Sequence, residues 1–231
     1  MQRQRNNTLR HALILRIVTI LLTLGPALLM AQSGGETNPD NRPRINPNII
    51  PPRQPKPRQE LTTLTPTPHE LKTHFNQNIH RPRVVALFSP TCGQCVKLAR
   101  TLQRAINKGF AGSDFSVMIV WTKIYEDDNE NNTQSSTAIV SDPRARHFYD
   151  EKQLASRAFA RDLVSPPPAV NLVLFYKPGK TWNEQPPPPD EWLHQITEGR
   201  DVDPDHYSAP DELADGLKSA MTKILPPRSD R

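Results

Sequence analysis

The chain of 231 residues has two cysteines, Cys92 and Cys95, separated by two residues in the stretch SPTCGQCVKL. Thiols at this spacing suit three kinds of chemistry: a redox couple, half of a metal site, or a short structural disulfide. A zinc site needs four ligands, but no second cysteine pair follows, and His69, His74 and His80 lack zinc-finger spacing. A disulfide that closes so short a loop adds little stability. We therefore favour the redox couple, expect no bound metal, and keep the structural disulfide as the alternative.

The residues after the pair predict a helix that begins at the cysteines. Apolar residues recur there at helical spacing until a glycine ends the pattern (Leu98, Ala99, Leu102, Ile106, Gly109). A cysteine in the first turn of a helix meets free backbone N–H groups and the positive end of the helix dipole, and both favour the thiolate. Because only the thiolate attacks a disulfide, we predict Cys92 as the nucleophile and the more buried Cys95 as the resolving thiol.

Strand and helix patterns alternate around this pair. Buried strands are predicted at residues 83–89, 115–121 and 169–176, and further helices at 67–75, 150–163 and 213–224. Thr67 is the expected N-cap of the first helix and Ser208 the expected cap of the last. The polar residues 126–137 are expected to form a loop. This alternation predicts an α/β fold with one domain.

The first 31 residues have the pattern of a secretory signal peptide or an N-terminal anchor. Basic residues precede an apolar run at 17–31, which is short against the roughly 20 residues of a membrane-spanning helix. We expect export, with cleavage of the leader favoured over anchoring. The protein is therefore expected to be periplasmic or extracytoplasmic, either free or held at the inner membrane by its N-terminus.

The composition divides the rest of the chain. Residues 32–65 are rich in proline and are expected to be a disordered linker, residues 66–225 the folded domain, and residues 226–231 a disordered tail. The formal net charge of the whole chain is +5, but four arginines of the leader supply most of it. The remainder is almost balanced in charge, so we expect no nucleic-acid partner.

The stretch VVALFSPTCGQCVKL resembles the active-site segment of the thioredoxin superfamily. The later motifs VMIVWTKI, DPRARHFYDEKQLASRAF, VNLVLFYKPGKTW and PPPPDEWLHQI are similar to a group of exported bacterial thioredoxin-like domain proteins whose function is not settled. The likeness covers about residues 66 to 196. It implies one thioredoxin-like domain, with a central β-sheet flanked by helices, that needs no organic cofactor because the two sulfurs carry the electrons.

Two features depart from the pattern of that superfamily. Its members carry a buried acid six residues before the first cysteine, which helps to move the proton of the resolving thiol, and Ala86 stands there instead. They also have a cis-proline before the strand that faces the disulfide. The corresponding place falls near Val170 or Asn171, and the prolines at 166–168 come slightly too early. We therefore expect slow release of a bound partner and a peptide-binding loop that differs from that of the superfamily.

Other polar and aromatic residues are weaker candidates for the site. Trp182, Trp192 and His194 could line a groove beside Cys92, but we interpret them as structural residues at the edge of the core. His147 is interpreted as a turn residue. Three acids could attract a cation, but we interpret them as part of a solvated loop (Asp127, Asp128, Glu130).

The sequence thus predicts an exported, monomeric thiol–disulfide oxidoreductase that uses Cys92 and Cys95 on protein disulfides or small thiols. A redox protein of the membrane is a further candidate partner. The alternative is a non-catalytic interaction or redox-sensor domain with a structural disulfide.

Overall fold

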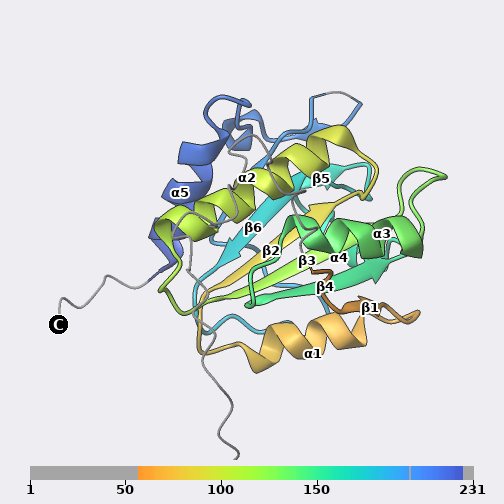
Figure 1. Cartoon of the computed structure of the whole chain (residues 1–231), viewed down its shortest axis with the longest axis horizontal. Helices are drawn as coiled ribbons and strands as arrows, with labels where there is room; N and C mark the ends of the chain where they lie inside the picture. Colours follow the sequence, from red (N-terminus) through yellow and green to blue (C-terminus); the bar gives the residue numbers. More distant parts are fainter. Residues whose placement is uncertain (1–56, 198, 226–231) are drawn as a thin grey trace, which may run out of the picture. The chain divides into compact units, whose positions relative to one another are not determined.

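The computed structural model describes residues 57–197 and 199–225 (Figure 1). The predicted leader at 1–31, most of the linker at 32–65 and the tail at 226–231 lie outside the described residues. Within the described ranges, no helix has both the length and the apolar character that crossing a bilayer requires.

The domain is built on a sheet of six strands in the order β1-β4-β3-β2-β6-β7. Its strands are β1 (Leu61–Thr63), β2 (Arg83–Phe88), β3 (Ser116–Thr122), β4 (Ala145–Asp150), β6 (Leu172–Tyr176) and β7 (Glu191–His194). The first four in this spatial order run parallel, whereas β6 is antiparallel to β2 and β7 is antiparallel to β6. A separate antiparallel pair joins β5 (Val164–Ser165) to β8 (Asp201–Val202).

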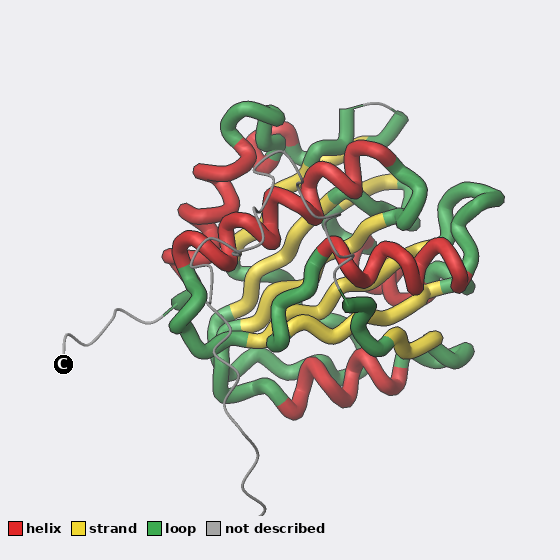
Figure 2. Tube along the Cα trace, in the orientation of Figure 1, coloured by secondary structure: helices red, strands yellow, loops and turns green. Residues whose placement is uncertain are grey.

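Helices cover both faces of the six-stranded sheet, as Figures 1 and 2 show. They are α1 (His69–Gln77), α2 (Gly93–Gly109), α3 (Glu130–Ser136), α4 (Leu154–Ala160) and α5 (Leu213–Ile224). Helices α2 and α5 pack against one face, and α1 and α4 supply the apolar side chains of the other. Because both faces are covered, β2 and β3 read as continuous apolar runs without alternation. The predicted α/β domain with a central, helix-flanked sheet is confirmed.

Strand β2 shows how the two cores are divided. Val84, Ala86 and Phe88 face the side of α2 and α5, and Val85 and Leu87 face the side of α1 and α4. This division follows from the period of two along a strand. The second core is rich in aromatic rings, where Trp182 packs edge-to-face against Phe75 and Phe159. Trp182 is 2% exposed, so its interpretation as a structural residue is correct.

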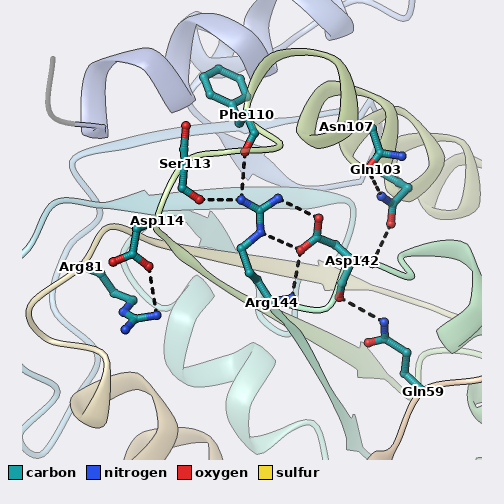
Figure 3. Close-up of polar contacts among 9 residues, drawn as sticks. All are labelled: Gln59, Arg81, Gln103, Asn107, Phe110, Ser113, Asp114, Asp142 and Arg144. Atoms are coloured by element: carbon teal, nitrogen blue, oxygen red, sulfur yellow. Dashed lines mark hydrogen bonds and ion pairs between the residues drawn. The ribbon is translucent and has the colours of Figure 1, made fainter. Parts of the chain in front are cut away.

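The folded domain begins before residue 66, within the segment expected to be a linker. Strand β1 pairs with β4, and Leu64 is buried in the second core. The backbone N–H of Gln59 donates to Thr137 Oγ1 at 3.0 Å. Its side-chain amide donates to the carbonyl of Asp142 at 3.0 Å (Figure 3). Three residues of strand carry too little pattern to be recognised against a proline-rich background.

Two helix caps and two elements differ from the predictions. The residue before α1 is Pro68 rather than Thr67, and the residue before α5 is Glu212 rather than Ser208; neither of the observed residues makes a side-chain cap hydrogen bond. Helix α3 lies inside the expected loop at 126–137, where the side chain of Asn129 accepts from the N–H of Asn132. The polar sequence of α3 has no apolar period that would reveal the helix. Strand β4 is a further element that the sequence does not predict, because its sequence ARHFYD mixes charged and apolar residues.

Candidate active site at Cys92 and Cys95

The two cysteines lie where β2 passes into α2, at the carboxyl ends of the parallel strands. Cys92 is the N-cap of α2, and its sulfur accepts a hydrogen bond from the N–H of Cys95 at 3.4 Å. Cys92 is half-buried, Cys95 is fully buried, and both are free thiols. The expected placement, with an accessible first cysteine and a buried second one, is therefore what the structure shows.

The surroundings shift the two thiols in opposite directions. The pKa of Cys92 is lowered to about 6, chiefly by a hydrogen bond from the Cys95 side chain, with smaller contributions from the backbone N–H groups of Cys95 and Gln94. Burial raises the pKa of Cys95, and so does its hydrogen bond with Cys92. At neutral pH the pair therefore holds one thiolate at the surface and one protonated thiol beneath it.

Asp128 organises the loops around Cys92. It is fully buried, and its carboxylate accepts five hydrogen-bond donors from two separate segments at 2.6–3.1 Å (Ser89 Oγ, Thr91 N, Thr91 Oγ1, Ile124 N, Tyr125 N). The interpretation of Asp128 as part of a solvated loop is wrong. The sequence gives no signal for this role, since the donors lie at 89–91 and 124–125 and only the fold brings them together.

Ser89 connects this carboxylate to the cysteine pair. Its hydroxyl donates to Asp128 Oδ2 at 2.9 Å and accepts from the N–H of Cys92 at 3.2 Å. The charge of Asp128 also raises the pKa of both thiols. Ala86 is buried on the same side of β2 as Cys95, as the sequence implied. A carboxylate is thus absent from the Ala86 position but present beside the pair on another loop.

A hollow of about 200 Å³ opens beside Cys92. Its wall includes Tyr125, Pro168, Ile196 and Arg200. The Pro167–Pro168 peptide bond is cis. Pro168, one of the prolines expected to come slightly too early for this place, lines the hollow at Cys92. Asn171, between it and β6, has a left-handed backbone conformation (φ 68°). Val170 and Asn171, near which the resemblance places the corresponding position, line the same hollow.

Trp192 and His194 lie on β7 and not beside Cys92. The indole of Trp192 stacks with two imidazoles, with ring centroids 5.6 Å from His194 and 4.2 Å from His206. His194 is buried, accepts from the N–H of Ile196 at 3.0 Å, and lies 3.1 Å from the carbonyl of Asp203. Neither residue lines the hollow at Cys92. Their interpretation as structural residues is correct.

His147 is not in a turn: it is buried in the middle of β4. Its Nδ1 accepts from the indole N–H of Trp121 at 3.0 Å, and its Nε2–H donates to the carbonyl of Val140 at 3.0 Å. These partners fix the neutral tautomer, and burial lowers its pKa to about 4. His147 is therefore a structural residue of the sheet.

The remaining acids of the predicted polar loop are solvated, as expected. Asp127 and Glu130 are exposed. Within residues 57–197 and 199–225, no group of three or more histidine, cysteine, aspartate or glutamate side chains has an arrangement that could hold a metal ion.

No family model matches this sequence, and no curated protein matches it. Several solved structures are similar to parts of it. A thioredoxin-like protein in its oxidised form is 16% identical with a TM-score of 0.34, and the match covers 42% of this chain and 61% of that one. This chain therefore spans less than two thirds of that protein.

Two further structures are matched over more of their length. A secreted disulfide oxidoreductase of Mycobacterium tuberculosis is 15% identical with a TM-score of 0.36, over 62% of this chain and 84% of that one. The thioredoxin domain of a thiol-disulfide oxidoreductase from Bacteroides vulgatus is 13% identical with a TM-score of 0.37, over 65% and 83%.

Proposed function

We propose that this chain, which has the thioredoxin superfamily fold, is a thiol–disulfide oxidoreductase acting on protein disulfides or small thiols. The observation that carries the proposal is the opposite shift of two neighbouring thiols at the start of α2. One sulfur is ready to attack at neutral pH, and the other keeps its proton until it is needed. The leader pattern supports action outside the cytoplasm, in the periplasm or on the outer side of the membrane.

In the reductive direction, the Cys92 thiolate attacks one sulfur of a partner disulfide. A Cys92–partner disulfide forms, the partner's own S–S bond breaks, and its second sulfur leaves as a thiolate that takes a proton from solvent. The N–H of Cys95 donates a hydrogen bond to the attacking sulfur at 3.4 Å, which stabilises its thiolate at the helix terminus. The hollow lined by Tyr125 and Pro168 leaves room for the partner at that sulfur.

The second step releases the partner. The Cys95 thiol gives its proton to water, and the resulting thiolate attacks the Cys92 sulfur. The Cys92–Cys95 disulfide forms, and the partner's remaining sulfur leaves as a thiolate that solvent protonates. Two electrons have then passed to the partner, which leaves as a dithiol. Burial is the main obstacle to a charge on Cys95 in this step, and the negative charge of Asp128 adds to it. Release is therefore the slow step, and the reverse sequence oxidises a dithiol.

Trapping the mixed disulfide tests this assignment. The Cys95→Ser variant is expected to accumulate mixed disulfides through Cys92, because the second step is blocked. Cys92→Ser is the matched control and is expected to trap nothing, since the remaining thiol is buried and protonated. Both full-length variants are expressed with their leader in a bacterial host, quenched with acid and compared on non-reducing gels.

An empty lane for Cys95→Ser, with the protein folded and exported, would contradict the oxidoreductase assignment. It would favour a non-catalytic domain whose cysteines form a structural disulfide. Equal trapping by both variants would contradict the roles assigned to the two thiols.

A further inference from the structure

The outer face of α2 carries a row of positive charge that leads away from Cys92. Lys97, Arg100, Arg104 and Lys108 are all exposed and recur at intervals of three or four residues, so they share one side of the helix. The helix contains no acidic residue. The chain after its leader is nearly neutral, so this row is a local concentration of charge.

Two adjoining hollows run along this row. The first, about 390 Å³, lies between α2 and the segment that precedes α5, where it is lined by Lys97, Arg100, Arg104 and Tyr207. The second, about 270 Å³, continues toward the end of α2 beside Lys218 of α5. We call these two hollows together the basic groove.

The basic groove is continuous with the hollow at Cys92. Gln94, Gln195 and Thr197 line both that hollow and the first part of the groove. Thr101 and Arg104 line both parts of the groove. A ligand can therefore extend from the cysteine along the cationic side of α2.

The cations of the groove have no partner of opposite charge in the described part of the chain. Lys97, Arg100, Arg104, Lys108 and Lys218 form no ion pair with any residue that the structure describes. Asp215 is the one acid among the residues that line the groove. Like charges left this close repel one another, and an anionic partner would relieve the repulsion.

Exposed aromatic rings mark the same region. In the described part of the chain, the large apolar side chains that are exposed are Tyr125 and Tyr207, at 54% and 40%. Tyr125 lines the hollow at Cys92, and Tyr207 lines the basic groove. Exposed aromatic rings beside cations are typical of surfaces that bind polypeptides.

We propose that the basic groove binds an acidic polypeptide segment next to the disulfide that Cys92 attacks. This inference rests on the proposed function and adds the class of substrate. From Gln94 to Lys108 the helix axis extends about 20 Å, the length of roughly six residues of extended chain and far more than a single small thiol. The chain's own linker is an unsuitable occupant, because residues 32–65 carry more basic than acidic residues.

A pair of disulfide peptides tests the proposal. Both contain the same disulfide, and one has glutamates where the other has glutamines. The reduced full-length protein is expected to reduce the acidic peptide roughly tenfold faster at low salt, and added salt should remove this preference. The triple variant Lys97→Gln, Arg100→Gln, Arg104→Gln is expected to bring the ratio of the two rates close to one.

A second triple variant controls for the loss of three charges. Lys72→Gln, Arg161→Gln and Lys177→Gln remove three cations that line neither the hollow at Cys92 nor the basic groove. This variant is expected to keep the preference for the acidic peptide. If it loses the preference as fully as the groove variant, the effect belongs to net charge and the proposal is overturned.

Two further ligands separate a polypeptide from other anions. Oxidised glutathione and vesicles of anionic lipid are compared between the wild-type protein and the groove variant. A loss of glutathione reduction, or of vesicle binding, as large as the loss for the acidic peptide would overturn the assignment to a polypeptide. A loss confined to the acidic peptide supports it.

A binding measurement keeps this proposal distinct from the proposed function. The Cys92→Ser, Cys95→Ser double variant is titrated with the acidic peptide in which serines replace both cysteines, and binding is followed by fluorescence anisotropy. Binding that is lost in the groove variant supports the groove even if no reduction occurs with the wild-type protein. Reduction without any preference for the acidic peptide sustains the oxidoreductase and overturns the groove.

Discussion

At the two ends of the parallel strands β2, β3 and β4, side chains of opposite charge satisfy the backbone groups that lack hydrogen-bond partners within a helix. At the amino ends of the strands, one buried and one half-buried arginine donate hydrogen bonds to backbone carbonyls. At the carboxyl ends, buried carboxylates accept them from backbone N–H groups. The reactive Cys92 lies at the carboxyl ends, and the difference between the two ends explains why a thiolate is stabilised there.

At the amino end, Arg83 and Arg144 donate hydrogen bonds to carbonyls at the C-termini of helices α1 and α2. Arg83, the first residue of β2, is fully buried and donates to the carbonyls of Phe75, Lys177 and Lys180 at 2.8–3.1 Å. Arg144 precedes β4 and donates to the carbonyls of Phe110 and Ser113, while its guanidinium also pairs with Asp142 (Figure 3). Phe75 belongs to the last turn of α1, and Phe110 caps α2.

At the carboxyl end, the corresponding groups are anions. Asp128 accepts three backbone N–H groups, and Asp150, the last residue of β4, accepts those of Leu154 and Ser156 at the start of α4. Cys92 takes the same position at the start of α2, where its sulfur accepts from Cys95 N. The backbone N–H groups of Cys95 and Gln94 lower the pKa of Cys92 in this position, and they add to the larger effect of the hydrogen bond from the Cys95 side chain, so that the pKa falls to about 6.

The difference follows from chain direction. Parallel strands run into helix starts at their carboxyl ends, where free N–H groups favour negative charge. At the amino ends of the strands, the chain arrives from the C-terminus of a helix, where free carbonyls favour positive charge. The fold thus favours a thiolate at the carboxyl ends of these strands.

The largest test of this comparison removes one buried charge from each end. Arg83→Met leaves three carbonyls without donors, and Asp128→Asn turns an amide N–H₂ toward backbone N–H groups. Each is expected to lower the free energy of unfolding by about 3 kcal/mol, measured by urea denaturation.

Only Asp128→Asn, the change at the carboxyl end, is expected to alter the pKa of Cys92. In the wild-type protein and in Arg83→Met, the iodoacetamide reaction of Cys92 is expected to have a midpoint near pH 6. In Asp128→Asn the midpoint should fall, because the charge that raises the pKa of Cys92 is gone. A midpoint that moves in Arg83→Met, or stays unchanged in Asp128→Asn, would break the comparison.

His147 tests a site between the two ends, where burial opposes the charged form of the side chain. Its pKa in the folded protein is about 4, below the 6.5 of an unfolded histidine. The unfolded state therefore gains the proton first, and stability should fall by about 3 kcal/mol as the pH drops from 6.5 to 4. His147→Asn is expected to lower overall stability yet flatten this slope in urea titrations at several pH values. An unchanged slope would assign the acid sensitivity to other groups.

Two buried tyrosines give a smaller, matched test. The hydroxyl of Tyr149 donates to the carbonyl of Asp128 at 2.9 Å, whereas that of Tyr176, which pairs with Arg83 across the sheet, has no partner among the described residues. Tyr149→Phe is expected to cost about 1 kcal/mol, and Tyr176→Phe should be close to neutral. Thermal unfolding of both variants measures the difference. Equal losses would show that the carboxyl end is not the more closely hydrogen-bonded of the two.

The smallest effect is expected from an exposed pair at the amino end. Arg81 and Asp114 lie 3.1 Å apart, with side chains 45% and 76% exposed (Figure 3). Asp114→Asn should change stability by less than about 0.5 kcal/mol, because water and salt screen the pair. A loss as large as that of the Arg83 variant would mean that exposure does not separate the two kinds of arginine.

The sequence by itself determined the local features of this protein. The spacing of Cys92 and Cys95, the apolar runs of β2 and β3 and the stripe of α5 each depend on neighbours a few residues away. These features were enough to predict the α/β class, the start of α2 at the cysteines and the different depths of the two thiols.

Only the tertiary structure decided which polar residues matter around them. Asp128 reads as a loop acid because its donors lie at 89–91 and 124–125, and His147 reads as a turn residue because its partner Trp121 lies on another strand. Strand β1 becomes visible only through its pairing with β4. Hydrogen bonds between distant segments leave no periodic trace in a single sequence, since periodicity records burial within one element and not the identity of the group across from it.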